Sequence, residues 1–136
     1  MNLTDQVVPQ REDFFAFMND YPADTPVAMI NILKFKDKSG NGDETGQQAY
    51  LRYSKNMEPL LAKAQGKIIW MGNVNQTVIG DTSDQPHMVL IVEYPSKQHF
   101  IDMSTSAEYK VIGQDREIAL EYGGLLASST INPAVE

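Results

Sequence analysis

Residues 87–116, HMVLIVEYPSKQHFIDMSTSAEYKVIGQDR, decide the fold of this chain. Their first part, from Met88 to Tyr94, is apolar at every position except Glu93. Because successive side chains of a strand point to opposite faces, this run predicts a strand that is covered on both faces. Pro95 stops the strand, and Ser96 is a suitable N-cap for a helix. The stretch therefore predicts a buried strand that leads directly into a helix.

The neighbouring segments give the order of the remaining elements. PVAMINILKF, residues 26–35, predicts a second strand covered on both faces, with Asn31 as its one polar interior residue. A long amphipathic helix follows, in which Pro59 predicts a kink or a restart and after which Gly66 is expected at the C-terminus. The expected strands cover residues 26–35, 67–80, 87–94 and 125–131, and the expected helices cover 47–65, a short segment after Pro95, and 106–122, ended by Gly123 and Gly124.

The order β-α-β-β-α-β predicts an α+β fold in which a four-stranded antiparallel sheet carries both helices on one face. The central strands are apolar on both faces, but the helices can cover only one of them. The other face must be covered by something else, most simply by a second copy across a two-fold axis. We therefore expect a homodimer that packs two open sheet faces together.

An additional short helix is expected before this fold. Residues 9–21 have proline at an early position, acidic residues in the first turn and a stripe of Phe14, Phe17, Met18 and Tyr21. This helix is interpreted as a lid or a docking element. The expected organisation is an N-terminal extension over residues 1–25, a ferredoxin-like domain over 26–132 and a tail over 133–136.

Composition excludes several classes of function. The chain of 136 residues has 11 Lys and Arg against 18 Asp and Glu, a net charge of −7, which disfavours a nucleic-acid partner. It has no cysteine, so thiolate nucleophiles and cysteine metal sites are impossible. No apolar run reaches the roughly 20 residues that cross a bilayer. A cytoplasmic protein that does not associate with membranes is expected.

Several motifs resemble one known family. They are Tyr50 and Tyr53 followed by Pro59, Gly66-Lys67, Gly80, Glu93-Tyr94-Pro95-Ser96, Phe100, Ser106-Ala107-Glu108-Tyr109 and Arg116. In this order and at about these spacings they resemble domain-of-unknown-function family 1330, with Tyr94 in place of Phe, Ala107 in place of Pro and Lys67 in place of a second glycine. The resemblance covers roughly residues 26–128 and leaves out the N-terminal helix.

The resemblance implies a ferredoxin-like subunit of a dimeric α/β barrel. The wider superfamily includes cofactor-independent monooxygenases, haem-degrading enzymes, lactone isomerases and dye peroxidases, and fold alone does not choose among them. A haem enzyme would require an axial histidine on the second core helix, which has none.

Three residues are candidates for catalysis. Asn31 and Glu93 interrupt two neighbouring strands and could share a face of the sheet, while Arg116 lies on the apolar side of its helix. One interpretation is a structural ion pair between Glu93 and Arg116. The other is a cleft for an apolar substrate, with Glu93 as general base and Arg116 or Asn31 stabilising an oxyanion. Four aromatic residues are core or interface residues first and walls of this ligand pocket second: Tyr50, Tyr53, Trp70 and Tyr109.

No cofactor and no metal are expected. His87 and His99 have no recognised ligand spacing with Glu93 or Asp102. The glycines of residues 40–46 have the spacing GxGxxxG, and the acidic residues between them would repel phosphate. The sequence therefore predicts a cofactor-independent enzyme that acts on a small apolar or aromatic metabolite. The alternative is a non-catalytic homodimeric module for small-molecule binding or interaction.

Overall fold

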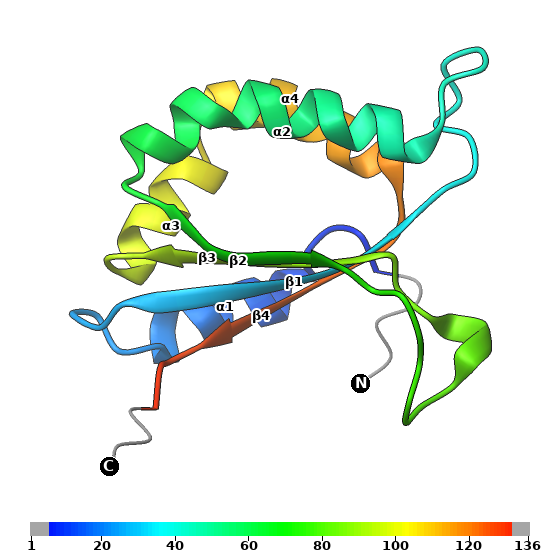
Figure 1. Ribbon diagram of the computed structural model, residues 1–136. Coiled ribbons are helices and arrows are strands. Elements are labelled where there is room, and N and C mark those ends of the chain that lie inside the picture. Colours follow the sequence, from blue (N-terminus) through cyan, green and yellow to red (C-terminus); the bar gives the residue numbers. More distant parts are fainter. Residues whose placement is uncertain (1–5, 132–136) are drawn as a thin grey trace.

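The structure, a computed structural model, describes residues 6–131. Its strands are β1 (Val27–Phe35), β2 (Lys67–Asn73), β3 (Met88–Tyr94) and β4 (Leu120–Ser128), and its helices are α1 (Arg11–Asp20), α2 (Gly46–Lys63), α3 (Lys97–Ser104) and α4 (Ala107–Ala119). The strands form one antiparallel sheet in the order β2-β3-β1-β4. Figure 1 shows α2 and α4 side by side over one face of this sheet. The predicted ferredoxin-like α+β fold with an extra N-terminal helix is confirmed.

Side chains cap the helices where the sequence places suitable residues. Thr45 and Gln48 form a reciprocal capping box at the start of α2, with N–H···O distances of 2.9 and 3.1 Å. Ser96 caps α3, and Ser106 caps α4. At the end of α2 the residue with positive φ is Gln65, at 59°, and not the expected Gly66. The amide of Gly66 instead donates to Leu61 O at 2.9 Å, which closes a Schellman motif.

The core lies between the sheet and the helices. Val27, Leu33 and Leu120 are fully buried there. On β1 and β3 one alternating set of side chains faces the helices: Val27, Met29, Asn31, Leu33 and Phe35, with Leu90, Val92 and Tyr94 across from them. The other set, which includes Ile30, Ile32, Val89 and Ile91, faces away from α2 and α4.

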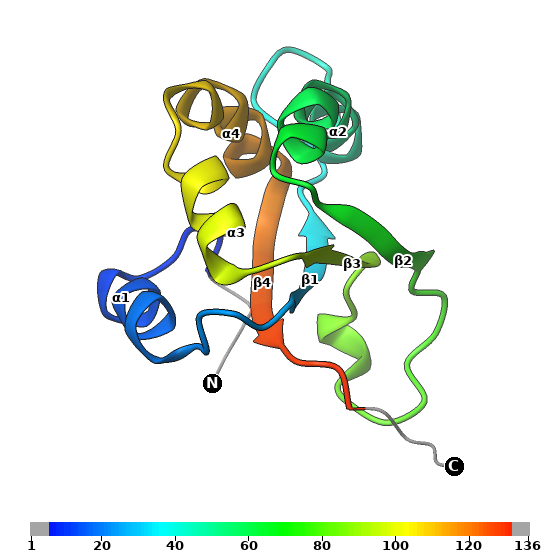
Figure 2. The same ribbon diagram turned by 90° about the vertical axis from the view of Figure 1, so that its left-hand side faces the viewer.

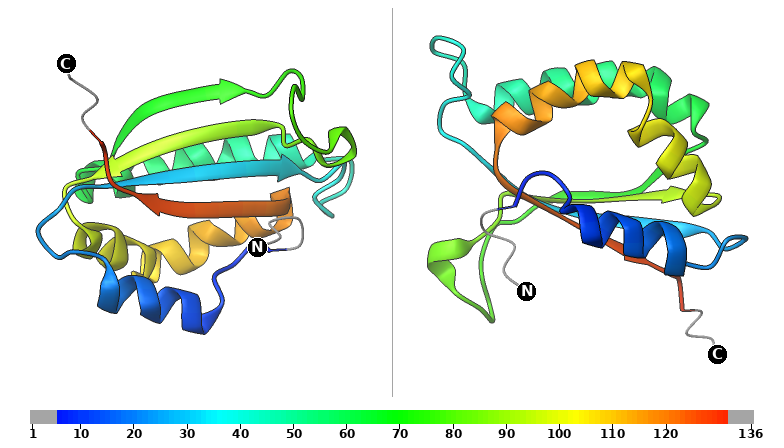
Figure 3. Two further views of the ribbon diagram at one scale, coloured as in Figure 1. Left: turned by 90° about the horizontal axis from the view of Figure 1, so that it is seen from below. Right: turned by 180° about the vertical axis from the view of Figure 1, so that it is seen from behind.

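That second face carries no α-helix in the part of the chain that the structure describes. Figure 3 shows the four strands from this side, with only the connection between β2 and β3 folding back at one end. There Tyr122 donates its hydroxyl to Asp84 O at 3.2 Å. The remaining apolar surface is the open sheet face on which the expected dimer depends.

Helix α1 lies along the β4 edge of the sheet, next to α3 (Figures 2 and 3). Phe17 packs edge-on against Phe100 of α3, with ring centroids 6.0 Å apart. Tyr21 donates its hydroxyl to Pro26 O at 2.9 Å and lies 3.2 Å from Ser128 O. The segment before α1 follows β4, where the Gly123 amide donates to Gln6 O at 2.8 Å. The N-terminal extension is therefore attached to the sheet edge and to α3.

Three element boundaries differ from the sequence prediction. Helix α4 ends at Ala119, and Gly123 and Gly124 lie inside β4, because Leu120 and Tyr122 pair with β1 and are buried. Strand β2 stops at Asn73 and leaves a longer connection, which contains a 3-10 turn over Thr82–Asp84. Helix α2 runs through Pro59 without a restart. None of the described helices is long and apolar enough to cross a membrane.

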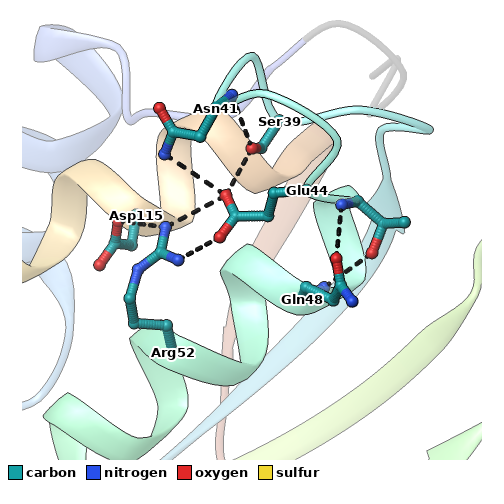
Figure 4. Close-up of polar contacts among 7 residues, drawn as sticks. Ser39, Asn41, Glu44, Gln48, Arg52 and Asp115 are labelled. Atoms are coloured by element: carbon teal, nitrogen blue, oxygen red, sulfur yellow. Dashed lines mark hydrogen bonds and ion pairs between the residues drawn. The ribbon is translucent and has the colours of Figure 1, made fainter.

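The glycine-containing loop before α2 is held by an ion-pair cluster (Figure 4). Glu44 pairs with Arg52 of α2 and also accepts a hydrogen bond from Ser39 at 2.5 Å. Arg52 reaches Asp115 of α4 at 2.9 Å. The hydrogen bond from Arg52 lowers the pKa of Glu44 to about 2. The cluster ties the loop to both helices.

Candidate functional site

A cavity of about 630 Å³ lies between the helix-facing side of the sheet, the helices and the N-terminal segment. Its floor is formed by β1, β3 and β4, and its other walls by α2, α3, α4 and residues 6–17. Most of the lining is apolar, as in Met29, Met57, Leu90, Val92 and Met103. This volume is within the usual range for small-molecule sites.

Helices α2 and α4 supply the tyrosine side chains of the cavity. Tyr50, Tyr53 and Met57 are three and four residues apart, so α2 presents them on one face. Tyr109 comes from α4, and its hydroxyl lies 3.2 Å from that of Tyr53. The Tyr109 ring crosses its own helix over Gly113, where a Cβ would lie 2.9 Å from the ring.

Tyr50 and Tyr53 remain protonated at neutral pH. Burial raises the pKa of Tyr50 to about 12 and that of Tyr53 well above its usual value of 10. The positive charge of Arg116, which lines the same cavity, acts in the opposite direction on the pKa of both hydroxyls. The cavity therefore contains neutral hydroxyl groups, which can donate hydrogen bonds, beside a positive charge.

Arg116 is on the inner side of α4, about two turns beyond Tyr109. Its Nη1 donates to Val7 O at 2.6 Å, and its Nη2 donates to Gly123 O at 3.2 Å. Within residues 6–131 no carboxylate lies within ion-pair distance of it. Arg116 thus brings an uncompensated charge to the cavity and holds the N-terminal segment against β4.

Asn31 lies on the floor of the cavity, in the middle of β1. Its Nδ2 lies 3.3 Å from Leu90 O and 3.3 Å from Met29 O. Its Oδ1 accepts no hydrogen bond from the described residues. The amide is therefore oriented by the sheet, with its oxygen left for another donor.

Residues 41–128 match the family model described as Domain of unknown function (DUF1330). The chain belongs to the DUF1330 family. The matched region begins later than the expected residue 26, but the resemblance seen in the sequence is confirmed. A search of curated proteins finds no match.

Solved structures similar to this DUF1330 chain agree with its fold. A protein of unknown function from Rhodopseudomonas palustris, RPA0582, has a TM-score of 0.89 at 27% identity, covering 96% of this chain and 100% of that one. A dimeric ferredoxin-like protein of unknown function from Bacteroides fragilis has a TM-score of 0.53 at 17% identity, covering 80% of this chain and 100% of that one. SnoaB, a cofactor-independent oxygenase from Streptomyces nogalater, has a TM-score of 0.53 at 9% identity, covering 82% of this chain and 99% of that one.

The cavity of this DUF1330 protein does not include Glu93. In the sheet, Glu93 lies across from Ala28 and Lys67 and belongs to the set of side chains that faces away from the helices. Asn31 pairs with Leu90, three residues from Glu93, so the two polar side chains point to opposite faces. The expected shared face and the expected ion pair between Glu93 and Arg116 are both wrong.

Trp70 is also outside the cavity. A register shift between Ile68 and Trp70 places the indole across from Ile91 on the open sheet face, where it is 54% exposed. The structure therefore brings together five of the seven predicted site residues: Asn31, Tyr50, Tyr53, Tyr109 and Arg116. Their functional roles remain predictions.

The sequence analysis missed part of the lining. Val7, Phe14 and Phe17 close one side of the cavity, and Ser54 contributes a hydroxyl from α2. The stripe of Phe14 and Phe17 was the available signal, since it predicted a lid but not what the lid covers. Within residues 6–131 no three His, Asp or Glu side chains cluster in a way that could hold a metal ion.

Proposed function

We propose that this DUF1330 protein binds a small apolar or aromatic metabolite in the cavity and acts on it as a cofactor-independent enzyme. The observation that carries the proposal is an apolar cavity of about 630 Å³ in which Arg116, Asn31 and the pair Tyr53–Tyr109 converge. Apolar walls with a few placed polar groups are typical of sites for small organic molecules.

The polar groups suit the stabilisation of an oxyanion. A guanidinium and tyrosine hydroxyls that line an apolar cavity favour negative charge that develops on a carbonyl oxygen of the substrate. Such charge develops when a proton is removed beside a carbonyl to give an enolate, which can then react with oxygen. We propose this reaction class by analogy with SnoaB, which shares the fold and is described as a cofactor-independent oxygenase.

The alternative is a non-catalytic binding module, and one observation favours it. Among the described lining residues the one carboxylate is Asp13, an exposed residue of α1, and no histidine lines the cavity. With Glu93 on the other face of the sheet, no strong base lies in the apolar interior of the cavity. A protein of this kind would hold its ligand without removing a proton from it.

Hydrogen exchange of a carbon acid separates the two functions. 1-Tetralone, an aromatic ketone with exchangeable protons beside its carbonyl, is incubated with the protein in D₂O and followed by proton NMR, with oxygen uptake recorded in parallel. The enzyme is expected to accelerate exchange or oxygen uptake, and Tyr53→Phe to lose about tenfold or more of that rate. Tyr122→Phe is the matched control, because that hydroxyl bonds to Asp84 O outside the cavity.

Two results would decide against catalysis. Binding of 1-tetralone, measured by calorimetry, without faster exchange or oxygen uptake would assign the protein to the non-catalytic class. Failure of 1-tetralone, naphthalene and 2-naphthol to bind at all would reject the cavity as a site for apolar and aromatic molecules.

We further propose that two copies associate through the open sheet face. This face carries Ile30, Ile32 and Ile91, together with Trp70 and Leu126, which are 54% and 37% exposed. Apolar side chains gathered on one face are typical of an interface, and the Bacteroides fragilis relative is described as dimeric.

Light scattering after size-exclusion chromatography tests this interface. The chain is expected to elute as a dimer, and Trp70→Asp to shift it toward the monomer. Leu51→Asp is the control, since Leu51 is 53% exposed on α2, away from the open sheet face. A monomeric native chain at micromolar concentration would reject the interface.

A further inference from the structure

The charge of Arg116 is the feature of the cavity that an apolar ligand would not use. Its two observed acceptors are backbone carbonyls, which are dipoles and do not neutralise a cation. Arg116 is half-buried, and a charge that is partly removed from water is stabilised when it pairs with an opposite charge. Within residues 6–131 no protein carboxylate supplies that pairing.

The guanidinium is held in a defined place with donors to spare. It lies against the backbone of β4, where a Cβ at Gly123 would be 2.7 Å from Nη2 and 3.2 Å from Cζ. Only a residue without a side chain admits such a close approach. Arg116 has five N–H donors, and the two bonds to Val7 and Gly123 occupy two of them.

A second donor lines the same cavity. The hydroxyls of Tyr53 and Tyr109 share one hydrogen bond, which uses one of their two protons. The other proton is free to point at a ligand atom. Since burial keeps Tyr53 protonated, this pair adds a donor and no negative charge.

We propose that the ligand is an amphipathic carboxylate, with an aromatic or branched apolar body and one carboxylate that pairs with Arg116. This inference rests on the proposed function and specifies its substrate class. The apolar body lies against Met29, Met57 and Val92, and the carboxylate accepts from the guanidinium and from the Tyr53–Tyr109 pair. The net charge of −7 disfavours ligands with several negative charges, so one carboxylate is assigned.

The experiment measures binding of three probes that share one ring system. The full chain is titrated by calorimetry with 2-naphthoate, with the neutral 2-naphthalenemethanol and with the cationic 2-naphthylmethylamine. Native protein is expected to bind 2-naphthoate about tenfold or more tighter than the alcohol, as one charge-assisted hydrogen bond implies. The amine is expected to bind most weakly.

Variants locate the charge responsible. Arg116→Gln is expected to remove the preference for 2-naphthoate and to leave binding of the alcohol unchanged, while Arg116→Lys keeps part of the preference. Lys110→Gln is the matched control, because Lys110 is exposed on the same helix, α4, and does not line the cavity. The comparison of probes on native protein remains decisive if Arg116→Gln does not fold.

The outcomes separate this inference from the function on which it rests. Equal binding of 2-naphthoate and the alcohol would overturn the carboxylate and leave the apolar cavity intact. A preference for 2-naphthoate that Arg116→Gln keeps, or that Lys110→Gln removes as fully as Arg116→Gln does, would also overturn it. No binding of any of the three probes would reject the cavity itself.

Discussion

Alkaline pH should destabilise this protein through Tyr50. The folded state holds the pKa of Tyr50 at about 12, and the unfolded chain returns it to the ordinary value of 10. A group whose pKa is raised by folding contributes its full stability below the unfolded pKa and loses it as the pH rises through the folded one. The contribution of Tyr50 is therefore complete below pH 10 and disappears by about pH 12.

The size of the effect follows from the two pKa values. Each tenfold change in the ionisation constant corresponds to about 1.4 kcal/mol, so Tyr50 accounts for about 3 kcal/mol of unfolding free energy. Tyr50 is only 5% exposed, so solvent does not screen this cost. Burial also raises the pKa of Tyr53 and Tyr94, which adds to the loss in the same direction.

Two measurements check the prediction. Urea unfolding at a series of pH values between 8 and 11.5 gives the free energy, and absorbance at 295 nm reports the tyrosinate formed in the native state. Tyr50→Phe is expected to reduce the alkaline loss of stability, since the titrating group is gone. If all six tyrosines ionise near pH 10 while the circular dichroism stays native, burial does not control their pKa and the reasoning fails.

Three further predictions concern stability and the N-terminal helix. Glu44→Gln should reduce the fall in unfolding free energy between pH 5 and pH 2, because Arg52 lowers the pKa of Glu44 from 4.5 to about 2 and this stabilisation is lost as the pH falls through that range. Urea unfolding at pH 5 and pH 2 measures the fall, and an equal fall in the native protein and the variant would contradict the prediction. Leu33→Ala should lower the free energy of unfolding, measured in urea, by about 2–5 kcal/mol, because Leu33 is fully buried. Leu51→Ala, at a residue that is 53% exposed, should change it by less than about 0.5 kcal/mol, and similar losses in the two variants would argue against this core. Phe17→Ala should speed amide hydrogen exchange in α1 and leave the exchange rates of α2 unchanged, because Phe17 contacts Phe100 of α3. Equal exchange in α1 before and after the substitution would show that this contact does not hold the helix.

The order of elements could be predicted because it depends on local signals. Apolar runs stopped by Pro95 and the capping residue Ser96 define β3 and the start of α3, and both boundaries are found. The end of α4 could not be predicted in this way. Leu120 fits a helical pattern as well as a strand, and only its pairing with Phe35 in the sheet decides between them.

The faces of the sheet were the weak point of the site prediction. A strand that is apolar on both faces gives no local signal for which side meets the helices, so Glu93 had no defined direction until the register with β1 was known. The irregularity after Ile68 reversed Trp70 for the same reason. Residues on helices were placed correctly, because Tyr50, Tyr53, Tyr109 and Arg116 share apolar faces that must turn inward.

Because residues 6–17 supply one wall of the cavity, part of the proposed ligand-binding surface is encoded outside the segment that matches the family. The wall formed by Val7, Phe14 and Phe17 precedes residues 41–128, the region that identifies the family. We therefore expect changes in this wall to alter the length of the ligand that the cavity admits, while the sheet, the helices and Arg116 stay the same. Exchanging this short leading segment between relatives is a direct way to re-engineer specificity without rebuilding the core.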